Sequence, residues 1–206
     1  MGTAEGTATP GRVRETQVAR SARTRAALLR AARELFAEKG FAATGREEIA
    51  RRAGVTRGAL YHHFASKTDV AAAVVVELEA ELVDLVVATA RQGSGVRDQL
   101  HRGCRAYMDA CADPTMARIL ADAPAVLGIE ACRALDAVAC GPLLAEVFGR
   151  ARAEGIVVPG DQEVAAALLL GLLNEAAGLI AAAPTDRALR RRVGDTVDEF
   201  VTRLFA

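Results

Sequence analysis

Residues Ile49–Phe64 read IARRAGVTRGALYHHF, a pattern of two short helical segments separated by a glycine turn. Ala50 is small where two helices must approach closely, and Gly54 can adopt the positive φ that a tight turn between them requires. Val55 and Leu60 are spaced to hold the second helix against the first. The stretch therefore predicts a helix-turn-helix, although a generic helical hairpin shares this pattern.

The second helix of this stretch carries a polar outward face. Thr56 caps it, and the outward positions that follow are Arg57, Gly58, Ala59, Tyr61 and His62. A helix with such a face is suited to lie in the major groove of DNA.

The flanking sequence continues the helical pattern on both sides. Upstream, a helix that starts near Ser21 carries an apolar face and ends at Gly40. Its apolar residues are Leu28, Ala31, Ala32, Leu35 and Phe36. Thr44 with Glu47 predicts a capping box for the short helix that follows. Downstream, Ser66 and Asp69 predict a second capping box, which opens a long helix to about Gln92.

The rest of the chain also reads as helical. Helices are predicted over about residues 96–112, 161–182 and 185–205, and Pro124, Gly128, Gly141 and Pro142 divide or kink the middle. Ala, Leu and Arg are abundant, and no β-branched runs bounded by turns occur. We therefore expect an all-α protein of about nine helices, with a three-helix N-terminal domain and a larger helical domain.

The charge divides the chain as well. Residues 1–67 hold 13 Lys/Arg against 6 Asp/Glu, whereas residues 68–206 hold 13 against 20, so that a net charge of zero hides an excess of +7 and one of −7. Such asymmetry favours a polyanion-binding N-terminal part, although arginine-rich helices also merely solvate their surfaces. We expect a disordered basic tail over residues 1–20, a DNA-binding domain over 21–67, and an effector-binding and dimerisation domain over 68–206.

The motif string of residues 24–69 resembles the N-terminal domain of the tetracycline-repressor (TetR) family. It comprises Phe41 and Thr44, Glu48-Ile49-Ala50, Ala53-Gly54-Val55, Leu60 to Phe64, and Ser66-Lys67. Two positions depart from the family pattern: Gly45 weakens the start of a helix, and Arg46 replaces a small residue. The resemblance implies a homodimeric repressor that binds a palindromic DNA operator and leaves it when a small effector binds.

The resemblance also assigns roles to single residues. Arg57 is the expected base reader, because a guanidinium pairs bidentately with guanine. Tyr61, His62 and Lys67 are expected at phosphates, Arg46 either at a phosphate or in solvent. The full expected DNA-binding set is Thr44, Arg46, Thr56, Arg57, Gly58, Ala59, Tyr61, His62 and Lys67.

The effector site is expected in the C-terminal part, as a mostly apolar pocket with a few polar anchors. One helix face carries Cys104, Tyr107, Met108 and Cys111, a stripe that is also typical of plain core. The polar candidates are Asp122, Asn174 and Glu175, and the last two interrupt the most apolar helix. A buried carboxylate needs a partner, which for Glu175 is either a structural one or the effector.

The last two helices are the expected dimer interface. The penultimate helix is apolar around much of its circumference and contains two glycines that permit close approach. The expected interface residues are Leu168, Gly171, Leu172, Gly178, Val193, Val197 and Val201. Pairing across a two-fold axis makes a four-helix bundle.

Other classes of protein fit the sequence less well. It holds no G-x-S-x-G elbow, P-loop, H-E-x-x-H or dinucleotide-binding fingerprint, so we expect no enzyme, cofactor or metal. The first twenty residues contain no apolar signal region, and the four cysteines form no C-x-x-C pair, which favours a cytoplasmic protein without a membrane span. The alternative within the same class is a DNA-binding regulator that a protein partner or a thiol redox change controls.

Overall fold

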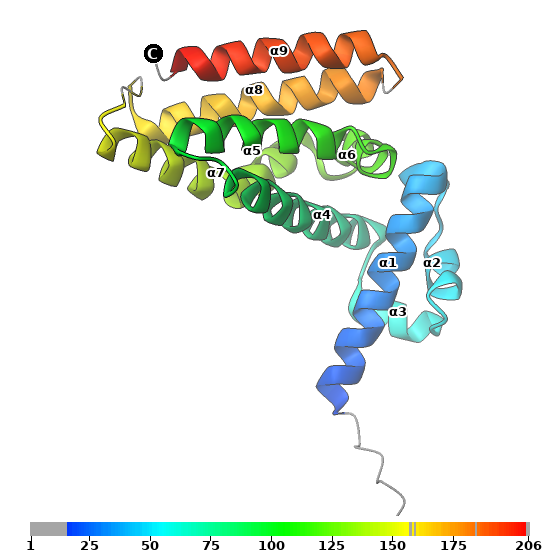
Figure 1. Ribbon diagram of the computed structural model, residues 1–206. Helices are drawn as coiled ribbons and strands as arrows, with labels where there is room; N and C mark the ends of the chain where they lie inside the picture. The colour runs from blue at the N-terminus through cyan, green and yellow to red at the C-terminus, as the bar shows by residue number, and fades with distance from the viewer. Residues whose placement is uncertain (1–15, 157, 159, 184, 205–206) are drawn as a thin grey trace, which may run out of the picture.

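Nine α-helices and no strand make up the part of the chain that the structure, a computed structural model, describes: residues 16–156, 158, 160–183 and 185–204 (Figure 1). This confirms the all-α prediction. The helices are α1 (Gln17–Ala43), α2 (Arg46–Arg52), α3 (Arg57–His63), α4 (Lys67–Ala90), α5 (Val96–Cys111), α6 (Pro114–Leu127), α7 (Ile129–Ala153), α8 (Gln162–Ala182) and α9 (Arg187–Leu204).

The N-terminal domain is built from α1, α2 and α3, which pack pairwise. Helix α1 begins at Gln17 because the Thr16 side chain accepts a hydrogen bond from the Ala19 amide at 3.2 Å and caps it. Residues 17–20 are thus helical and were wrongly assigned to a disordered tail. The rest of that predicted tail, residues 1–15, lies outside the described residues.

Helix α4 belongs to both parts of the molecule. Its predicted capping box is confirmed, since the Ser66 hydroxyl accepts from the Asp69 amide and the Asp69 carboxylate accepts from the Ser66 amide. From there α4 packs first against α1 and then against α5, α6 and α7 (Figure 1). The buried apolar residues form one cluster that runs from the N-terminal domain through α4 into the C-terminal helices.

A single glycine separates the two helices in the middle of the chain. Gly128, with φ at 88°, separates α6 from α7. Pro124 and Pro142 lie inside α6 and α7 without ending them, so α7 runs for 25 residues where the sequence predicted shorter or kinked helices. The Pro142 ring therefore does not act as the break that its residue type favours in a helix interior.

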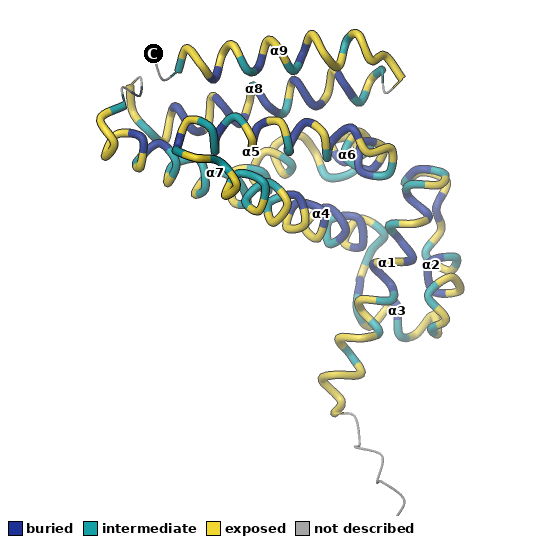
Figure 2. Tube along the Cα trace, in the orientation of Figure 1, coloured by how far each residue is buried: buried dark blue, intermediate teal, exposed yellow. Residues whose placement is uncertain are grey.

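Helices α8 and α9 lie side by side along the edge of the larger domain, far from α2 and α3 (Figure 1). Helix α8 is long and apolar enough to cross a membrane, but it packs against α5, α7 and α9 as a core helix does. Its opposite face is exposed, as is the outer face of α9 (Figure 2). An apolar helix with one bare face is typical of a surface that a further partner covers.

Candidate functional site

Helices α2 and α3 and the turn between them form the helix-turn-helix. Gly54 has φ at 69°, as the sequence predicted, and the Val55 amide donates to the Ala50 carbonyl at 3.0 Å to close the turn. Ile49 and Leu60 are buried between α1, α2 and α3. These contacts fix α3 rigidly on the domain and leave its other face free.

The free face of α3 carries most of the residues that were expected to contact DNA. The Thr56 hydroxyl accepts from the Ala59 amide at 3.2 Å and caps the helix, while Ala59 itself is half-buried. The exposed residues are Thr56, Arg57, Gly58, Tyr61 and His62. A Cβ built on Gly58 would meet nothing closer than 3.9 Å, so this position is open to a close approach by a partner's surface.

Arg57 and Tyr61 both bind the carboxylate of Glu47, a residue that was expected only as part of a capping box. The Glu47 Oε1 atom accepts from Arg57 Nη2 at 3.0 Å and from the Tyr61 hydroxyl at 3.3 Å. The hydrogen bond from its own backbone amide, followed by the charge of Arg57, lowers the pKa of Glu47. Glu47 is thus an ionised anchor on α2 for two side chains of α3.

Arg46 holds the same tyrosine from the other side. Its guanidinium lies over the Tyr61 ring at 4.4 Å and donates to the Ala65 carbonyl at 2.7 Å. Arg46 is therefore neither loose in solvent nor placed only for a phosphate, which were the two expected roles. It positions the end of α3 through a stacked, hydrogen-bonded contact.

Two expected DNA contacts lie elsewhere. Thr44 is only 2% exposed, and its hydroxyl donates to the Gly40 carbonyl at 2.8 Å. The N-cap of α2 is Gly45, without a side-chain hydrogen bond, so the predicted Thr44–Glu47 capping box is absent. Thr44 instead satisfies a carbonyl at the end of α1, a bond that a local threonine can form as easily as a cap.

Lys67 is the second expected DNA contact that forms other bonds in the structure. Its Nζ donates to the carbonyls of Phe41 at 2.9 Å, Thr44 at 3.0 Å and Ala42 at 3.4 Å, and it lies 4.1 Å from the centre of the Phe41 ring. All three ammonium hydrogens are used in this way. The lysine ties α4 to the end of α1, where unpaired carbonyls attract a cation, and is not the expected free phosphate contact.

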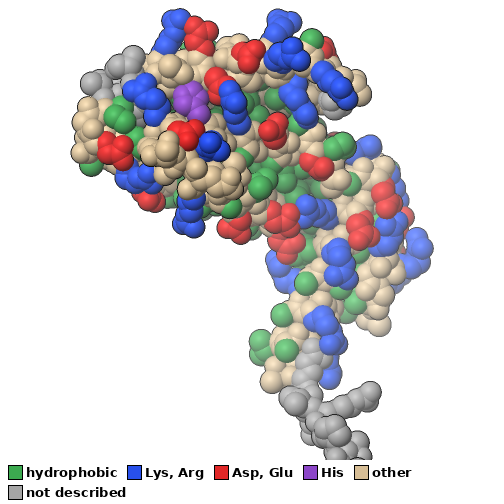
Figure 3. Space-filling view, viewed as in Figure 1, with side chains coloured by type: hydrophobic (Ala, Val, Ile, Leu, Met, Phe, Trp, Pro, Cys, Tyr) green, Lys and Arg blue, Asp and Glu red, His purple; other side chains and the backbone are tan. Residues whose placement is uncertain are grey.

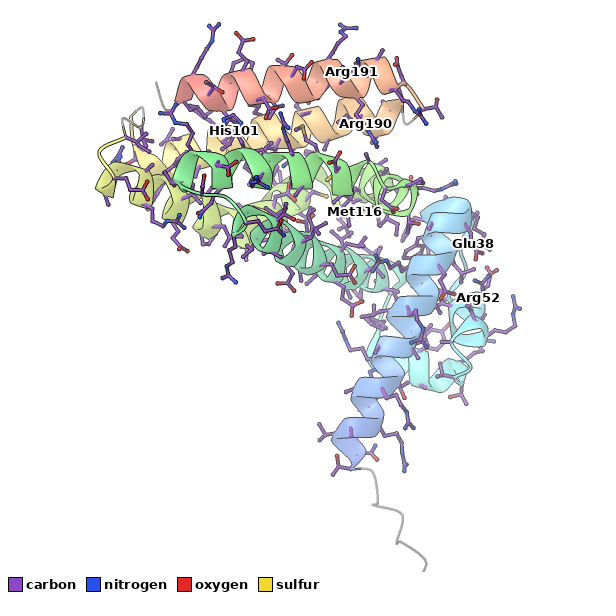
Figure 4. The ribbon with its side chains drawn as sticks, viewed as in Figure 1. Glu38, Arg52, His101, Met116, Arg190 and Arg191 are labelled. Atoms are coloured by element: carbon purple, nitrogen blue, oxygen red, sulfur yellow. The ribbon has the colours of Figure 1, made fainter. Side chains whose placement is uncertain are left out.

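The opposite side of the helix-turn-helix is held by ion pairs. Arg52 of α2 makes a bidentate contact with Glu38 of α1 at 2.8 and 3.0 Å, and Lys39 pairs with Glu48 (Figure 4). Acidic and basic side chains accordingly alternate on this part of the surface (Figure 3). Exposed pairs of this kind add little stability, but they fix the angle of α2 on α1.

Asp122, one of the expected effector residues, lies at the junction of the two domains. Its Oδ2 atom accepts from the Phe41 amide at 3.0 Å, and a Cβ built on Gly40 would come within 3.2 Å of the same oxygen. Gly40 has φ at 81°, so only glycine fits the conformation and the space. Beside this contact lies a cavity of about 20 Å³, enough for one water molecule.

The expected apolar stripe of α5 is buried in the C-terminal core. Its members are Cys104, Tyr107, Met108 and Cys111. The Tyr107 hydroxyl donates to Asn174 Oδ1, and Asn174 Nδ2 donates to Asp136 Oδ2 at 2.6 Å. Glu79 of α4 hydrogen-bonds Asp136 in turn. We call Glu79, Tyr107, Asp136 and Asn174 the core polar cluster; it joins α4, α5, α7 and α8.

Two carboxylates in this cluster were not expected. Burial, followed by the charge of Asp136, raises the pKa of Glu79 to about 7, and burial raises the pKa of Asp136. Like charges that share a buried site cannot both ionise cheaply, so the pair holds a proton. A signal was present in the sequence, because Glu79 falls beside Leu78 and Leu82 on the buried face of α4.

Cys104 and Cys111 are buried thiols, whereas Cys132 and Cys140 are half-buried. Burial raises the pKa of Cys104, Cys111 and Cys140 to about 12. The thiolate is the reactive form, so these environments disfavour reaction with an oxidant. The raised pKa values of these three thiols argue against the thiol-redox alternative.

A broad, open hollow lies on the other side of α5. It measures about 620 Å³ and is lined mainly by charged residues of that helix, among them His101, Arg102 and Arg105. His101, labelled in Figure 4, has its Nδ1 atom 3.2 Å from Asp198 Oδ1 of α9. Arg105 pairs with the same carboxylate. This open, charged surface does not resemble the mostly apolar pocket that we expect for an effector.

The expected interface residues fall into two groups. Leu168 is 71% exposed, and Gly171, Glu175 and Gly178 lie on the same bare face of α8, with Leu172 half-buried at its edge. Glu175 is therefore a surface residue and not a buried polar anchor. The α9 residues Val193, Val197 and Val201 are buried within the single chain, because they form the inner stripe of α9 against the core (Figure 2).

Comparison with known proteins bears on both parts of the chain. Residues 28–74 match the family described as bacterial regulatory proteins, tetR family, and residues 97–204 match the tetracyclin repressor-like C-terminal domain. The chain is 39% identical over 85 residues to the transcriptional activator FasR of Mycolicibacterium smegmatis, and 38% identical over 73 residues to the repressor BepR of Brucella suis. These matches span 39% and 35% of those relatives and 41% and 35% of this chain.

Solved structures extend the likeness to nearly the whole chain. A TetR-family transcriptional regulator from Pectobacterium atrosepticum is 31% identical, with a TM-score of 0.80 over 93% of this chain and 98% of that one. The fatty acid degradation regulator FadR of Bacillus halodurans shares the fold at 20% identity, with a TM-score of 0.69 over 85% of this chain and 96% of that one. This chain is therefore a DNA-binding transcriptional regulator of the TetR family.

Proposed function

We propose that this protein is a repressor that binds a palindromic DNA operator as a homodimer, in the cytoplasm, and that a small effector releases it. The exposed face of α3 carries this proposal, since it presents Arg57, Gly58 and Tyr61 on a rigidly held helix. Arg57 reads a guanine in the major groove, Ala59 contacts a thymine methyl, and Thr56, Tyr61 and His62 contact the backbone.

The second copy is proposed to cover the bare face of α8. Val164, Leu168 and Leu179 are exposed there, at 57%, 71% and 46%, and Gly171 and Gly178 leave room for a close helix. Phe200 of the neighbouring helix α9 is exposed as well. Pairing of α8 and α9 with their two-fold mates makes the four-helix bundle and places two α3 helices on successive half-sites.

The effector is proposed to bind in the C-terminal core at the core polar cluster, among Cys104, Met108 and Cys111. This region combines buried apolar side chains with a few hydrogen-bonding groups, which is the composition of most small-molecule sites. Helix α4 carries Glu79 in this cluster and Lys67 at its DNA-binding end. A ligand that displaces α4 therefore changes the spacing of the two α3 helices.

The first experiment is selection of bound fragments from the source genome by the purified protein, at near-physiological salt. A short palindrome beside a few genes supports the proposal, and the products of those genes narrow the effector class. Reporter expression from that promoter distinguishes repression from activation, which matters because the relatives include both an activator and a repressor. Recovery of nothing above random DNA favours control by a protein partner.

A further inference from the structure

An acidic side chain on a surface that faces DNA requires a physical reason. Phosphates repel carboxylates, and a free carboxylate there weakens binding to every sequence. Glu47 is such a residue: it is exposed on α2 and lies directly against Arg57 and Tyr61 of the recognition helix. Its position among the DNA-reading side chains, rather than away from them, is the observation that carries the inference.

We infer that Glu47 is a specificity-determining residue, which holds the Arg57 guanidinium in the orientation that reads a base. This inference rests on the proposed role of Arg57. The carboxylate takes one Nη2 hydrogen of Arg57 at 3.0 Å. A guanidinium has five N–H donors, so a parallel pair of donors remains for the O6 and N7 atoms of a guanine.

The anchor is itself held in place. The Tyr61 hydroxyl donates to the same Glu47 oxygen, and the Tyr61 ring is fixed under the Arg46 guanidinium at 4.4 Å. The array thus runs from Arg46 through Tyr61 and Glu47 to Arg57, and alternates between α2 and α3. A long, flexible side chain that is oriented before it meets DNA loses less rotamer freedom on binding.

Two properties of Glu47 can be separated by substitution. Its negative charge weakens binding to all DNA, whereas its hydrogen bonds orient one base reader. Glu47→Gln removes the charge and keeps an acceptor oxygen for Arg57 and Tyr61. Glu47→Ala removes both.

The test measures binding of the full-length protein to a randomised-sequence DNA library and then to single-base variants of the selected site, at several salt concentrations. Arg57→Ala identifies the base pair that Arg57 reads. At that base pair, Glu47→Ala is expected to lose about three- to tenfold of the preference, part of the roughly 5- to 150-fold that one bidentate pair supplies. Glu47→Gln is expected to keep most of it, while both variants bind random DNA more tightly.

Glu38→Ala is the matched control, because it removes one arginine-paired carboxylate of the same domain at a distance from α3. It is expected to leave the base preference unchanged. If Glu47→Ala and Glu47→Gln raise affinity for every sequence by the same factor, Glu47 is only a repelling charge and the inference is overturned. If Arg57→Ala alters no base preference, the proposed role of Arg57 fails and the inference fails with it.

Discussion

The Asp122 carboxylate accepts a hydrogen bond from the Phe41 amide at 3.0 Å, across 81 positions of sequence. Lys67 donates to the carbonyl of the same Phe41 at 2.9 Å. Phe41 lies in the last turn of α1, beyond the kink at Gly40, and this turn is held by α6 through the Phe41 amide and by α4 through the Phe41 carbonyl. Both helices belong to the C-terminal domain for most of their length. The C-terminal domain therefore contacts the N-terminal DNA-binding domain at this turn.

Asp122→Ala is expected to lower the free energy of unfolding by about 1–2 kcal/mol, because it leaves the Phe41 amide without its charged acceptor. Operator affinity is expected to fall as well, since α6 no longer holds the N-terminal domain through this hydrogen bond. Chemical denaturation and operator binding measure the two effects. Asp122→Asn keeps an acceptor oxygen and serves as the control; equal losses in both variants would argue against the hydrogen bond.

Lys67→Met is expected to lower the free energy of unfolding by about 1–3 kcal/mol, because the carbonyls at the end of α1 lose their cation. The slope of log affinity against log salt is expected to stay the same, since no phosphate contact is removed. Denaturation and salt-dependent binding check this. A slope that becomes shallower by about one, with unchanged stability, would instead identify Lys67 as a phosphate contact.

The Glu79–Asp136 pair predicts a pH dependence of stability. The pKa of Glu79 is raised to about 7 from an ordinary value of 4.5, so the folded state binds more protons than the unfolded state between these values. Stability is therefore expected to fall as pH rises through the window from about 4.5 to 7, by about 2–3 kcal/mol.

Glu79→Gln provides the control, because the amide resembles the protonated acid. Its free energy of unfolding is expected to match that of the wild type near pH 5 and to exceed it by about 2–3 kcal/mol near pH 8. Denaturation at pH 5, 6, 7 and 8 gives the difference curve. A difference that is constant with pH would show that Glu79 does not share a proton with Asp136.

Leu168→Glu is expected to prevent the proposed dimer from forming and to abolish high-affinity operator binding, because it places a charge in the proposed apolar interface. Sedimentation equilibrium measures the association. Leu85→Glu is the matched control, since Leu85 is an exposed leucine on α4, a helix that packs against α1, α5, α6 and α7. If both variants remain dimeric, the bare face of α8 is not the interface.

Local sequence rules predicted the helix boundaries well because the causes are local. The turn at Gly54 and the Ser66–Asp69 capping box each depend on a few adjacent residues, and the end of α4 at Ala90 lies two residues before the predicted end near Gln92. The error at Thr44 has the same origin: its hydroxyl can bond forward as a cap or back to the Gly40 carbonyl, and packing against α1 decides.

The core polar cluster could be predicted only in part. Asn174 was singled out because it interrupts an apolar helix, but Glu79 and Asp136 meet only when α4 packs against α7. An apolar stripe on α9 predicts burial without naming the partner, which is why Val197 was assigned to a second copy and lies against its own core. An apolar pattern along one helix predicts that the helix face is buried. It does not identify whether the same chain or a second copy buries that face.

Helix α4 also constrains how this regulator can be divided or recombined. The predicted domain boundary between residues 67 and 68 falls at the first residues of α4, yet Val70 and Val74 further along are buried in the cluster that includes α1. A fragment cut there exposes the apolar face of α1 and is expected to aggregate. Chimaeras that exchange DNA-binding domains should therefore be joined at least two helical turns into α4. Each DNA-binding domain then keeps the part of α4 that covers its own α1.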